Sequence, residues 1–239
     1  MSSASSELPL KTMISSLAEM LGTSEPALLL TLTLLIGYPF GLFYNKFLYG
    51  KSPNLQHIFF TLVGLFLNYY NYGADTEHSI ICILVLFFVL LLCGGTLLSV
   101  GISFIFFMMY LLTAYFYTSS RDYDIKWTLP HCVITLRLIA LAFNVYDGTK
   151  KFDQLSEDQK KTALHRTPSL LEISGYCYFF GGFMVGPQFS MTQYLSFVHK
   201  RIPPNAFSGK PSCFFCSIQQ AIFRSFGLSS LSTWSYHPS

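Results

Sequence analysis

The stretch that decides the fold runs from Tyr123 to Gly148 and reads YDIKWTLPHCVITLRLIALAFNVYDG. Residues 128–146 are almost wholly apolar, and at 1.5 Å per residue they are long enough to cross a bilayer. Arg137 nevertheless lies near the middle of this stretch and His131 near its start. A charge at that depth is costly unless it is paired or faces a wet cavity. The stretch therefore predicts a membrane helix that borders a polar interior.

The composition of the whole chain also indicates a membrane protein. Hydrophobic residues make up 51% of the 239 residues and charged residues only 11%, whereas soluble domains are about 25% charged. So few charges cannot cover a globular surface, so we expect lipid to be the main solvent. The net charge of +3 is small, and it argues against a nucleic-acid partner because a basic stripe is needed to neutralise phosphates.

Long apolar windows that contain no charged residue, or a single one, predict the membrane spans. Five strong windows and a weaker sixth follow one another along the chain: 27–44, 55–72, 79–98, 100–117, 128–146 and 169–189. The predicted fold class is therefore all-α, a polytopic transmembrane helix bundle of five to six spans. Residues 1–26 form a polar N-terminal segment, 27–198 the membrane region, and 199–239 a tail that we expect to be poorly ordered.

The sixth window is interrupted by residues that break helices. It contains Glu172, Gly175, Gly181, Gly182 and the pair Gly186-Pro187. Such breaks persist in a membrane only where neighbouring groups or water satisfy the freed backbone. We expect either two short helices or a helix that enters the membrane only partway.

Arg137 and Glu172 are the two charged residues inside predicted spans. Their opposite signs in neighbouring spans favour a buried ion pair, which would lower the insertion cost of both. The alternative is that Arg137 holds the anionic head group of a ligand, such as a phosphate. Both residues are therefore candidates for the wall of a substrate cavity.

His131 and Tyr176 are the other candidate cavity residues. His131 follows Pro130 at a predicted helix start, where it serves more often in packing or hydrogen bonding than in catalysis. Tyr176 lies beside the Gly-rich break, and it is either an interface residue or part of a cavity. Cys213 and Cys216 form a single Cys-x-x-Cys pair without a second pair of ligands, so we expect no metal site and no bound cofactor.

Four ordered strings resemble a known family. They are Tyr123–Val133 (YDIKWTLPHCV), Pro168–Glu172 (PSLLE), Val185–Met191 (VGPQFSM) and Gly37–Phe40 (GYPF). Each is similar to the lysophosphatidylcholine acyltransferases of the membrane-bound O-acyltransferase family, and the likeness covers roughly residues 17 to 198. The resemblance implies a multi-pass protein of the endoplasmic reticulum membrane that transfers a fatty acyl group from acyl-CoA, its co-substrate, to a lysophospholipid.

The resemblance assigns no catalytic residue to this chain. The family's catalytic Asn and His lie well beyond its Gly-Pro-Gln-Phe string, and neither His199 nor His237 has matching neighbours. We therefore read the chain as the N-terminal half of such an acyltransferase, truncated and inactive by itself. The alternative is a non-catalytic isoform that binds or modulates the full-length enzyme, and association with that enzyme or with a second copy is possible.

Overall fold

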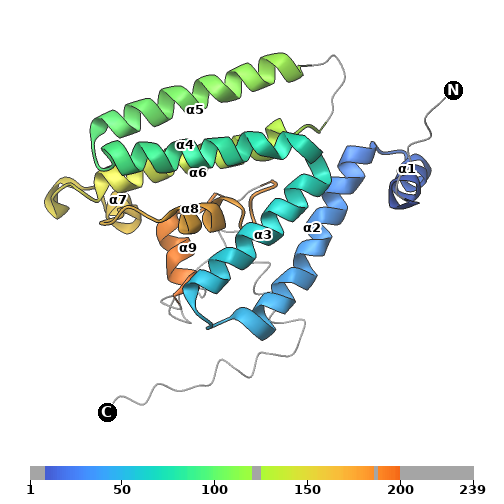
Figure 1. Ribbon diagram of the computed structural model, residues 1–239, viewed down its shortest axis with the longest axis horizontal. Coiled ribbons are helices and arrows are strands. Elements are labelled where there is room, and N and C mark those ends of the chain that lie inside the picture. The colour runs from blue at the N-terminus through green and yellow to red at the C-terminus, as the bar shows by residue number, and fades with distance from the viewer. Residues whose placement is uncertain (1–8, 120–124, 186–187, 200–239) are drawn as a thin grey trace, which may run out of the picture.

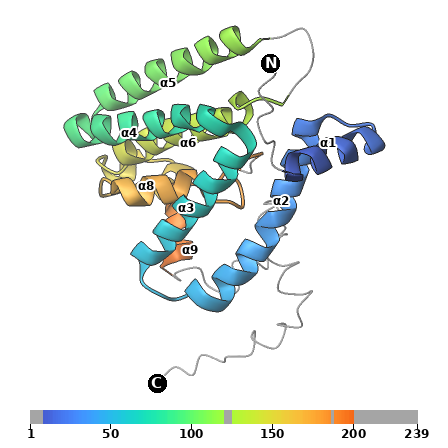
Figure 2. The same cartoon turned by 45° about the vertical axis from the view of Figure 1, so that its right-hand side comes forward.

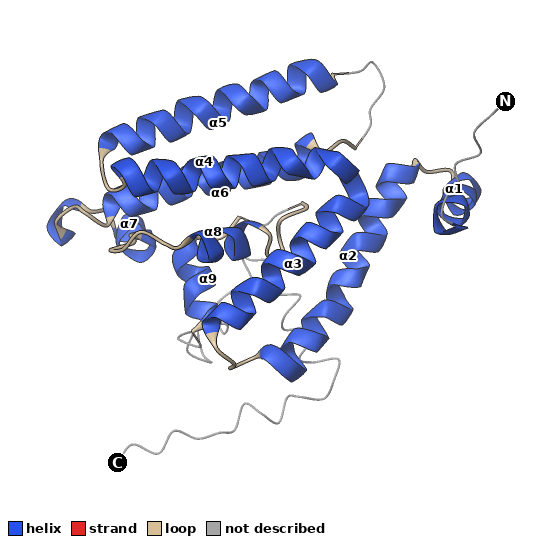
Figure 3. Ribbon diagram, viewed as in Figure 1, coloured by secondary structure: helices blue, strands red, loops and turns tan. Residues whose placement is uncertain are grey.

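The computed structural model describes residues 9–119, 125–185 and 188–199, and these residues form helices and connecting loops without a strand (Figure 3). The predicted break at Gly186-Pro187, the pair Cys213 and Cys216, and nearly all of the expected tail lie outside the described residues. The α-helices are α1 (Pro9–Leu21), α2 (Glu25–Phe43), α3 (Pro53–Tyr72), α4 (Thr76–Cys93), α5 (Leu97–Thr118), α6 (Thr128–Asp147), α7 (Glu157–Thr162), α8 (Leu170–Cys177) and α9 (Met191–Val198).

Two groups of long helices make up the molecule. Helices α4, α5 and α6 lie side by side, whereas α2 and α3 run obliquely to them (Figures 1 and 2). The short helices α8 and α9 lie beside α3, between the two groups. Helix α5 packs mainly on α6, and α3 packs mainly on α8. The sequence did not predict α1, which precedes α2 at the N-terminal end.

The predicted spans and the observed helices agree closely for the five strong windows. Among the described residues, four helical stretches are long and apolar enough to cross a membrane: Glu25–Leu48, Pro53–Cys93, Leu97–Thr118 and Thr128–Asp147. The second stretch has 41 residues because a 3₁₀ turn at Gly73–Asp75 joins α3 to α4 without interrupting the helical structure. Figure 1 shows a sharp change of direction at this turn. The chain is therefore a multi-pass membrane protein.

The sixth predicted span does not form one long helix. Helix α8 begins where the Ser169 hydroxyl accepts from the backbone N–H of Glu172 and the Glu172 carboxylate accepts from that of Ser169, a reciprocal capping box. It ends at Cys177 after eight residues, and α9 begins only at Met191. The Gly-rich sequence between them, with Gly181 and Gly182, has little tendency to continue a helix. The sixth window thus contains one short helix, α8, and the second short helix, α9, begins just after the window ends.

Helix α6 lies at the centre of the fold. Two thirds of its apolar window (67%) is buried, against 22–33% in the other three candidate stretches. The outer helices expose large apolar side chains such as Leu92 and Phe116, each 80% exposed, as expected where lipid is the solvent. The stretch that first indicated a polar interior is thus the most buried of the candidate spans.

Candidate functional site

Arg137 holds the end of α8 in place. Its Nη1 atom donates to the carbonyl oxygens of Tyr176 at 3.0 Å and Cys177 at 3.2 Å, and its Nη2 donates to that of Gly182 at 2.7 Å. The side chain is completely buried. Its guanidinium also lies over the rings of Phe189, 4.5 Å from the centroid, and Tyr176 at 5.5 Å. One buried cation therefore joins α6 to both sides of the helix break.

The physical reason for this arrangement is the short length of α8. The last carbonyls of a helix have no partner within the helix, and they form its negative end. At a buried depth such groups need donors, because no water is available to replace the missing bonds. The planar guanidinium supplies several N–H groups in a fixed fork. Arg137 thus satisfies carbonyls that the broken helix leaves open.

The predicted ion pair between Arg137 and Glu172 is wrong. Within the described part of the chain, Glu172 pairs instead with Arg166, whose Nη1 is 3.1 Å from Oε2 and whose Nη2 contacts Oε1. Glu172 lies at the first turn of α8 and Arg137 reaches its last turn, so the helix itself separates them. Pro168 and the short loop before α8 place Arg166 beside the carboxylate instead.

Two opposing effects set the pKa of Glu172. Burial raises it, but the hydrogen bonds from Arg166 and from the Ser169 backbone outweigh burial, so the pKa lies below its ordinary value. The Ser169 N–H lies 2.8 Å from Oε2. The ionised carboxylate therefore stabilises the start of α8, where a negative charge also suits the helix dipole.

Tyr176 is buried beside Arg137, as part of the same packed group. Its hydroxyl donates to the carbonyl of Phe189 at 2.6 Å, across the Gly-rich loop. Its ring contacts those of Phe189 and Tyr194, with centroids 5.4 and 5.8 Å apart. Tyr176 and Arg137 are the two predicted cavity residues that the structure brings together, and both bind backbone groups of the loop between α8 and α9.

Close packing of α3 on α8 depends on two glycines. A Cβ atom added at Gly64 of α3 would overlap the Tyr178 carbonyl and lie 2.5 Å from the Tyr178 Cβ. One added at Gly175 of α8 would lie 2.5 Å from the Tyr194 hydroxyl and 3.2 Å from the Cα of His57. Small residues at such positions let membrane helices approach closely. The broken segment, which comprises α8 and the loop that follows it, is therefore packed between α3 and α6.

A buried polar cluster at the far side of this contact was not predicted. The His57 Nδ1 and the Tyr194 hydroxyl are 2.8 Å apart, which ties α3 to α9. Gln56 accepts from the Tyr44 hydroxyl at 2.6 Å and donates to the Lys51 carbonyl at 2.9 Å. These contacts had no signal in the sequence. His57 and Tyr194 are more than a hundred residues apart along the chain, and Tyr44 lies in a π-helical turn that the sequence did not predict.

His131 occupies a separate place on α6, where its side chain contacts α4 and α5. It is 2% exposed, and its Nε2 lies 3.9 Å from the Cys82 sulfur. Its ring contacts Tyr110 and Trp127, with centroids 5.5 and 5.2 Å apart. No hydrogen-bond partner for its Nδ1 is present among the described residues. His131 thus lies outside the Arg137 group, and the four predicted cavity residues fall into three places.

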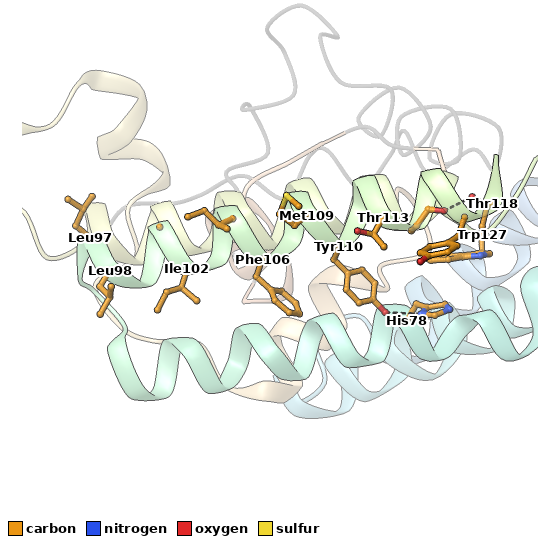
Figure 4. Close-up of a pocket in the computed structure, with 14 residues that line it drawn as sticks. His78, Leu97, Leu98, Ile102, Phe106, Met109, Tyr110, Thr113, Thr118 and Trp127 are labelled. Atoms are coloured by element: carbon orange, nitrogen blue, oxygen red, sulfur yellow. Dashed lines mark hydrogen bonds between the residues drawn. The ribbon is translucent and has the colours of Figure 1, made fainter.

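A cavity of about 1230 Å³ lies along α5, and we call it the α5 cavity. Figure 4 shows its apolar part along α5 and its polar groups at the end where His78 and Trp127 lie. As far as the structure describes its lining, that lining contains none of the four predicted residues, although His131 contacts two lining residues, Tyr110 and Trp127. The lining consists of His78, Leu97, Leu98, Gly101, Ile102, Ile105, Phe106, Met109, Tyr110, Thr113, Ala114, Tyr117, Thr118 and Trp127.

A metal centre is not indicated by the described residues, which contain no group of three or more His, Cys, Asp or Glu side chains that could hold an ion. The chemistry that these residues offer is of two kinds. One is a set of donors that hold a broken helix, centred on Arg137. The other is a long apolar space with aromatic and hydroxyl groups at one end.

Comparison with known proteins places this arrangement in a family. The family model described as MBOAT, membrane-bound O-acyltransferase family, matches residues 112–237. The chain is 48% identical over 185 residues to the human protein "Lysophospholipid acyltransferase 5". The aligned residues cover 77% of this chain and 38% of the relative. The Drosophila melanogaster protein of the same name is 47% identical over 194 residues, which are 80% of this chain and 39% of the relative.

A more distant relative is the Gallus gallus "Membrane-bound glycerophospholipid O-acyltransferase 2", 29% identical over 155 residues, with 63% of this chain and 30% of the relative covered. The chain thus spans less than two fifths of the length of the relatives it matches. The family match includes α6, α8 and α9, the elements that build the Arg137 group. The chain belongs to the membrane-bound O-acyltransferase family.

Proposed function

We propose that this chain forms the N-terminal part of a lysophospholipid acyltransferase, which corresponds to less than two fifths of the length of its relatives. The reaction is transfer of a fatty acyl group from acyl-CoA to the free hydroxyl of lysophosphatidylcholine or a related lysophospholipid. The observation that carries the proposal is the 48% identity over 185 residues to a protein named for this activity. The expected location is the endoplasmic reticulum membrane.

The arrangement of helices supports a multi-pass membrane domain with a broken segment inside it. Helices α3 and α4 have 20 and 18 residues, so each is long enough to cross a bilayer separately. With α2, α5 and α6, this gives five crossings, and the turn at Gly73–Asp75 lies at a membrane surface. The segment from α8 to α9 then lies as a broken element between crossings, which requires the backbone donors that Arg137 provides.

Arg137, Tyr176 and Glu172 have positioning roles in this proposal. Arg137 and Tyr176 fix the loop after α8, and Glu172 with Arg166 fixes the start of α8. His131 packs behind the α5 cavity. The acyl-transfer chemistry itself is expected to require residues outside this chain, so the chain alone is expected to be inactive.

A chimera tests the proposal directly. Residues 17–198 of this chain would replace the matching segment of the human relative, and microsomes would be assayed for incorporation of labelled acyl-CoA into lysophosphatidylcholine. We expect turnover well above a mock control. A chimera that is inactive although it gives a single symmetric peak on size-exclusion chromatography would contradict the proposal.

The chain alone provides the second arm of the same assay. Expressed at the level of the chimera, it should show no acyl transfer above the mock control. Turnover by the chain alone would show that it holds its own catalytic residues, and would overturn the statement that they lie elsewhere.

A further inference from the structure

We propose that the α5 cavity binds one membrane phospholipid, with an acyl chain along α5 and the phosphate-bearing head at the end formed by His78, Tyr110 and Trp127. This inference goes beyond the proposed function, because it concerns a lipid site apart from the broken segment at Arg137. It would hold for a membrane protein of any activity with this cavity.

The size and shape of the cavity favour a lipid. Its volume of about 1230 Å³ exceeds the upper end of pockets for drug-sized ligands, about 1,000 Å³. Lining residues are found from Leu97 to Thr118, the whole of α5, which at 1.5 Å per residue is about 33 Å long. An apolar space that extends along a whole membrane helix fits an extended hydrocarbon chain better than a compact molecule.

The two ends of the cavity differ in chemistry. Near the start of α5 the lining is apolar, with Leu97, Leu98 and Ile102, whereas the polar groups gather at the opposite end (Figure 4). An amphiphile has the same asymmetry, with one polar end and one long apolar part. A transmembrane helix of another protein would present apolar side chains along the whole length, and the polar end would then be buried against them.

The polar end is a built cluster rather than a scatter of surface groups. The His78 Nδ1 and the Tyr110 hydroxyl are 2.8 Å apart, and the His78 ring stacks on Trp127 with centroids 4.2 Å apart. Behind them, the buried His131 contacts both Tyr110 and Trp127, and its Nδ1 has no hydrogen-bond partner in the part of the chain that is described.

The neighbourhood of this cluster suits a phosphate at the membrane surface. Lys126 lies next to Trp127, and its ammonium group contacts the carbonyl of Thr118, which lines the cavity. Tryptophan and lysine are typical of the interface where lipid head groups lie. A cation beside hydroxyl and imidazole groups is the chemistry that recognises a phosphate.

Gly101 provides a way to fill the cavity without disturbing the helix bundle. It lines the cavity, and a Cβ atom added there meets nothing within 4 Å. Gly101→Phe should therefore occupy the apolar part while α5 keeps its packing. Leu112→Phe is a matched control, because Leu112 is an exposed residue of the same helix that is not part of the lining.

Photolabelling of the full chain in nanodiscs tests the proposal. The probe is a phosphatidylcholine with a diazirine in its acyl chain, and labelled peptides are identified by mass spectrometry. We expect labelling of α5 that unlabelled phosphatidylcholine competes away. Gly101→Phe should lower it about tenfold, the change that corresponds to 1.4 kcal/mol, and Leu112→Phe should leave it unchanged.

The polar end is tested by His78→Phe, which keeps an aromatic ring to stack on Trp127 and removes the imidazole. It should reduce labelling by the phosphatidylcholine probe but not by a diazirine fatty alcohol, which lacks the phosphate. The proposal is overturned if labelling is not saturable, if Gly101→Phe has no effect, or if crosslinking of α5 yields peptides of residues 199–239 or of a second copy instead of lipid.

Discussion

Arg137 and His131 lie six residues apart in α6, yet their surroundings differ sharply. The guanidinium of Arg137 donates to three backbone carbonyls and lies over two aromatic rings. The His131 imidazole has one long contact to a sulfur atom and, among the described residues, an unpartnered Nδ1. Both side chains are at least 98% buried. The same helix therefore uses one polar residue to complete a fold and leaves another beside a cavity.

The difference shows that burial of a polar group does not by itself reveal its role. A group whose donors are already used by backbone carbonyls is chiefly structural, because any ligand would have to displace those bonds. A group such as His131, whose Nδ1 has no partner among the described residues, keeps its capacity for a further hydrogen bond. Substitutions that separate these two cases should therefore affect stability in the Arg137 region and leave it unchanged in the His131 region.

The largest effect is expected from Arg137→Leu. The change leaves the carbonyls of Tyr176, Cys177 and Gly182 without their donor, and we expect a loss of roughly 3–5 kcal/mol in stability. This loss is measured by thermal unfolding in detergent, in which size-exclusion chromatography monitors the fraction of protein that stays folded. Arg137→Lys should recover only part of the loss, because an ammonium group lacks the planar fork. An unchanged melting temperature for Arg137→Leu would remove the structural role from this residue.

Gly64→Ala should have the next largest effect. The added methyl group would overlap the backbone of Tyr178, so α3 and α8 must separate, at a cost of roughly 1–3 kcal/mol. Gly101→Ala is the matched control, because its Cβ meets open space and alanine favours a helix by up to about 1 kcal/mol. The two variants are compared by thermal unfolding. Equal melting temperatures for both would mean that the contact between α3 and α8 is not tight.

A smaller effect is expected from acidification at Glu172. Its pKa is lower in the folded protein than in the unfolded chain, so its contribution to stability is present above the ordinary value of 4.5 and is lost as pH falls through the lowered value. The melting temperature should fall less between pH 7 and pH 4 in Glu172→Gln than in the wild type. Identical pH profiles would show that the pair with Arg166 does not stabilise α8.

The smallest change in stability is expected from His131→Leu. This substitution removes an unpartnered polar atom from a buried place and adds an apolar side chain. The free energy of unfolding should therefore fall by no more than an ordinary surface substitution causes, about 0.5 kcal/mol, or it should rise. Thermal unfolding measures this change. A large loss of stability would mean that His131 has a structural hydrogen bond comparable to those of Arg137.

The long helices were predictable from the sequence, since each contains an apolar window of the length that a bilayer requires, and Arg137 is the single charged residue in these windows. The windows 55–72 and 128–146 match Pro53–Tyr72 and Thr128–Asp147 to within two residues. The end of α4 was placed too late, at residue 98 instead of Cys93, because Gly94 and Gly95 are themselves uncharged. Apolar content alone does not mark where a tight turn begins.

The site was less predictable than the fold. The sequence indicated that Arg137 needs a partner or a wet cavity, but it could not show that the partners are backbone carbonyl groups, since every residue has one. The Gly-rich break between Tyr178 and Met191 was the signal that such carbonyls would need donors. The contact between His57 and Tyr194, and the α5 cavity, depend on how helices pack and had no local signal in the chain.

Hydrogen exchange in the segment after α8 tests the central claim most directly. The backbone amides of Tyr178 and Gly182 bond to the carbonyls of Ser174 and Phe179, so they report whether the broken segment stays closed. Exchange would be measured in nanodiscs for the wild type, Arg137→Leu and His131→Leu. We predict much faster exchange of residues 178–184 in Arg137→Leu and wild-type protection in His131→Leu. Equal protection in all three proteins would contradict the account that Arg137 holds the broken helix.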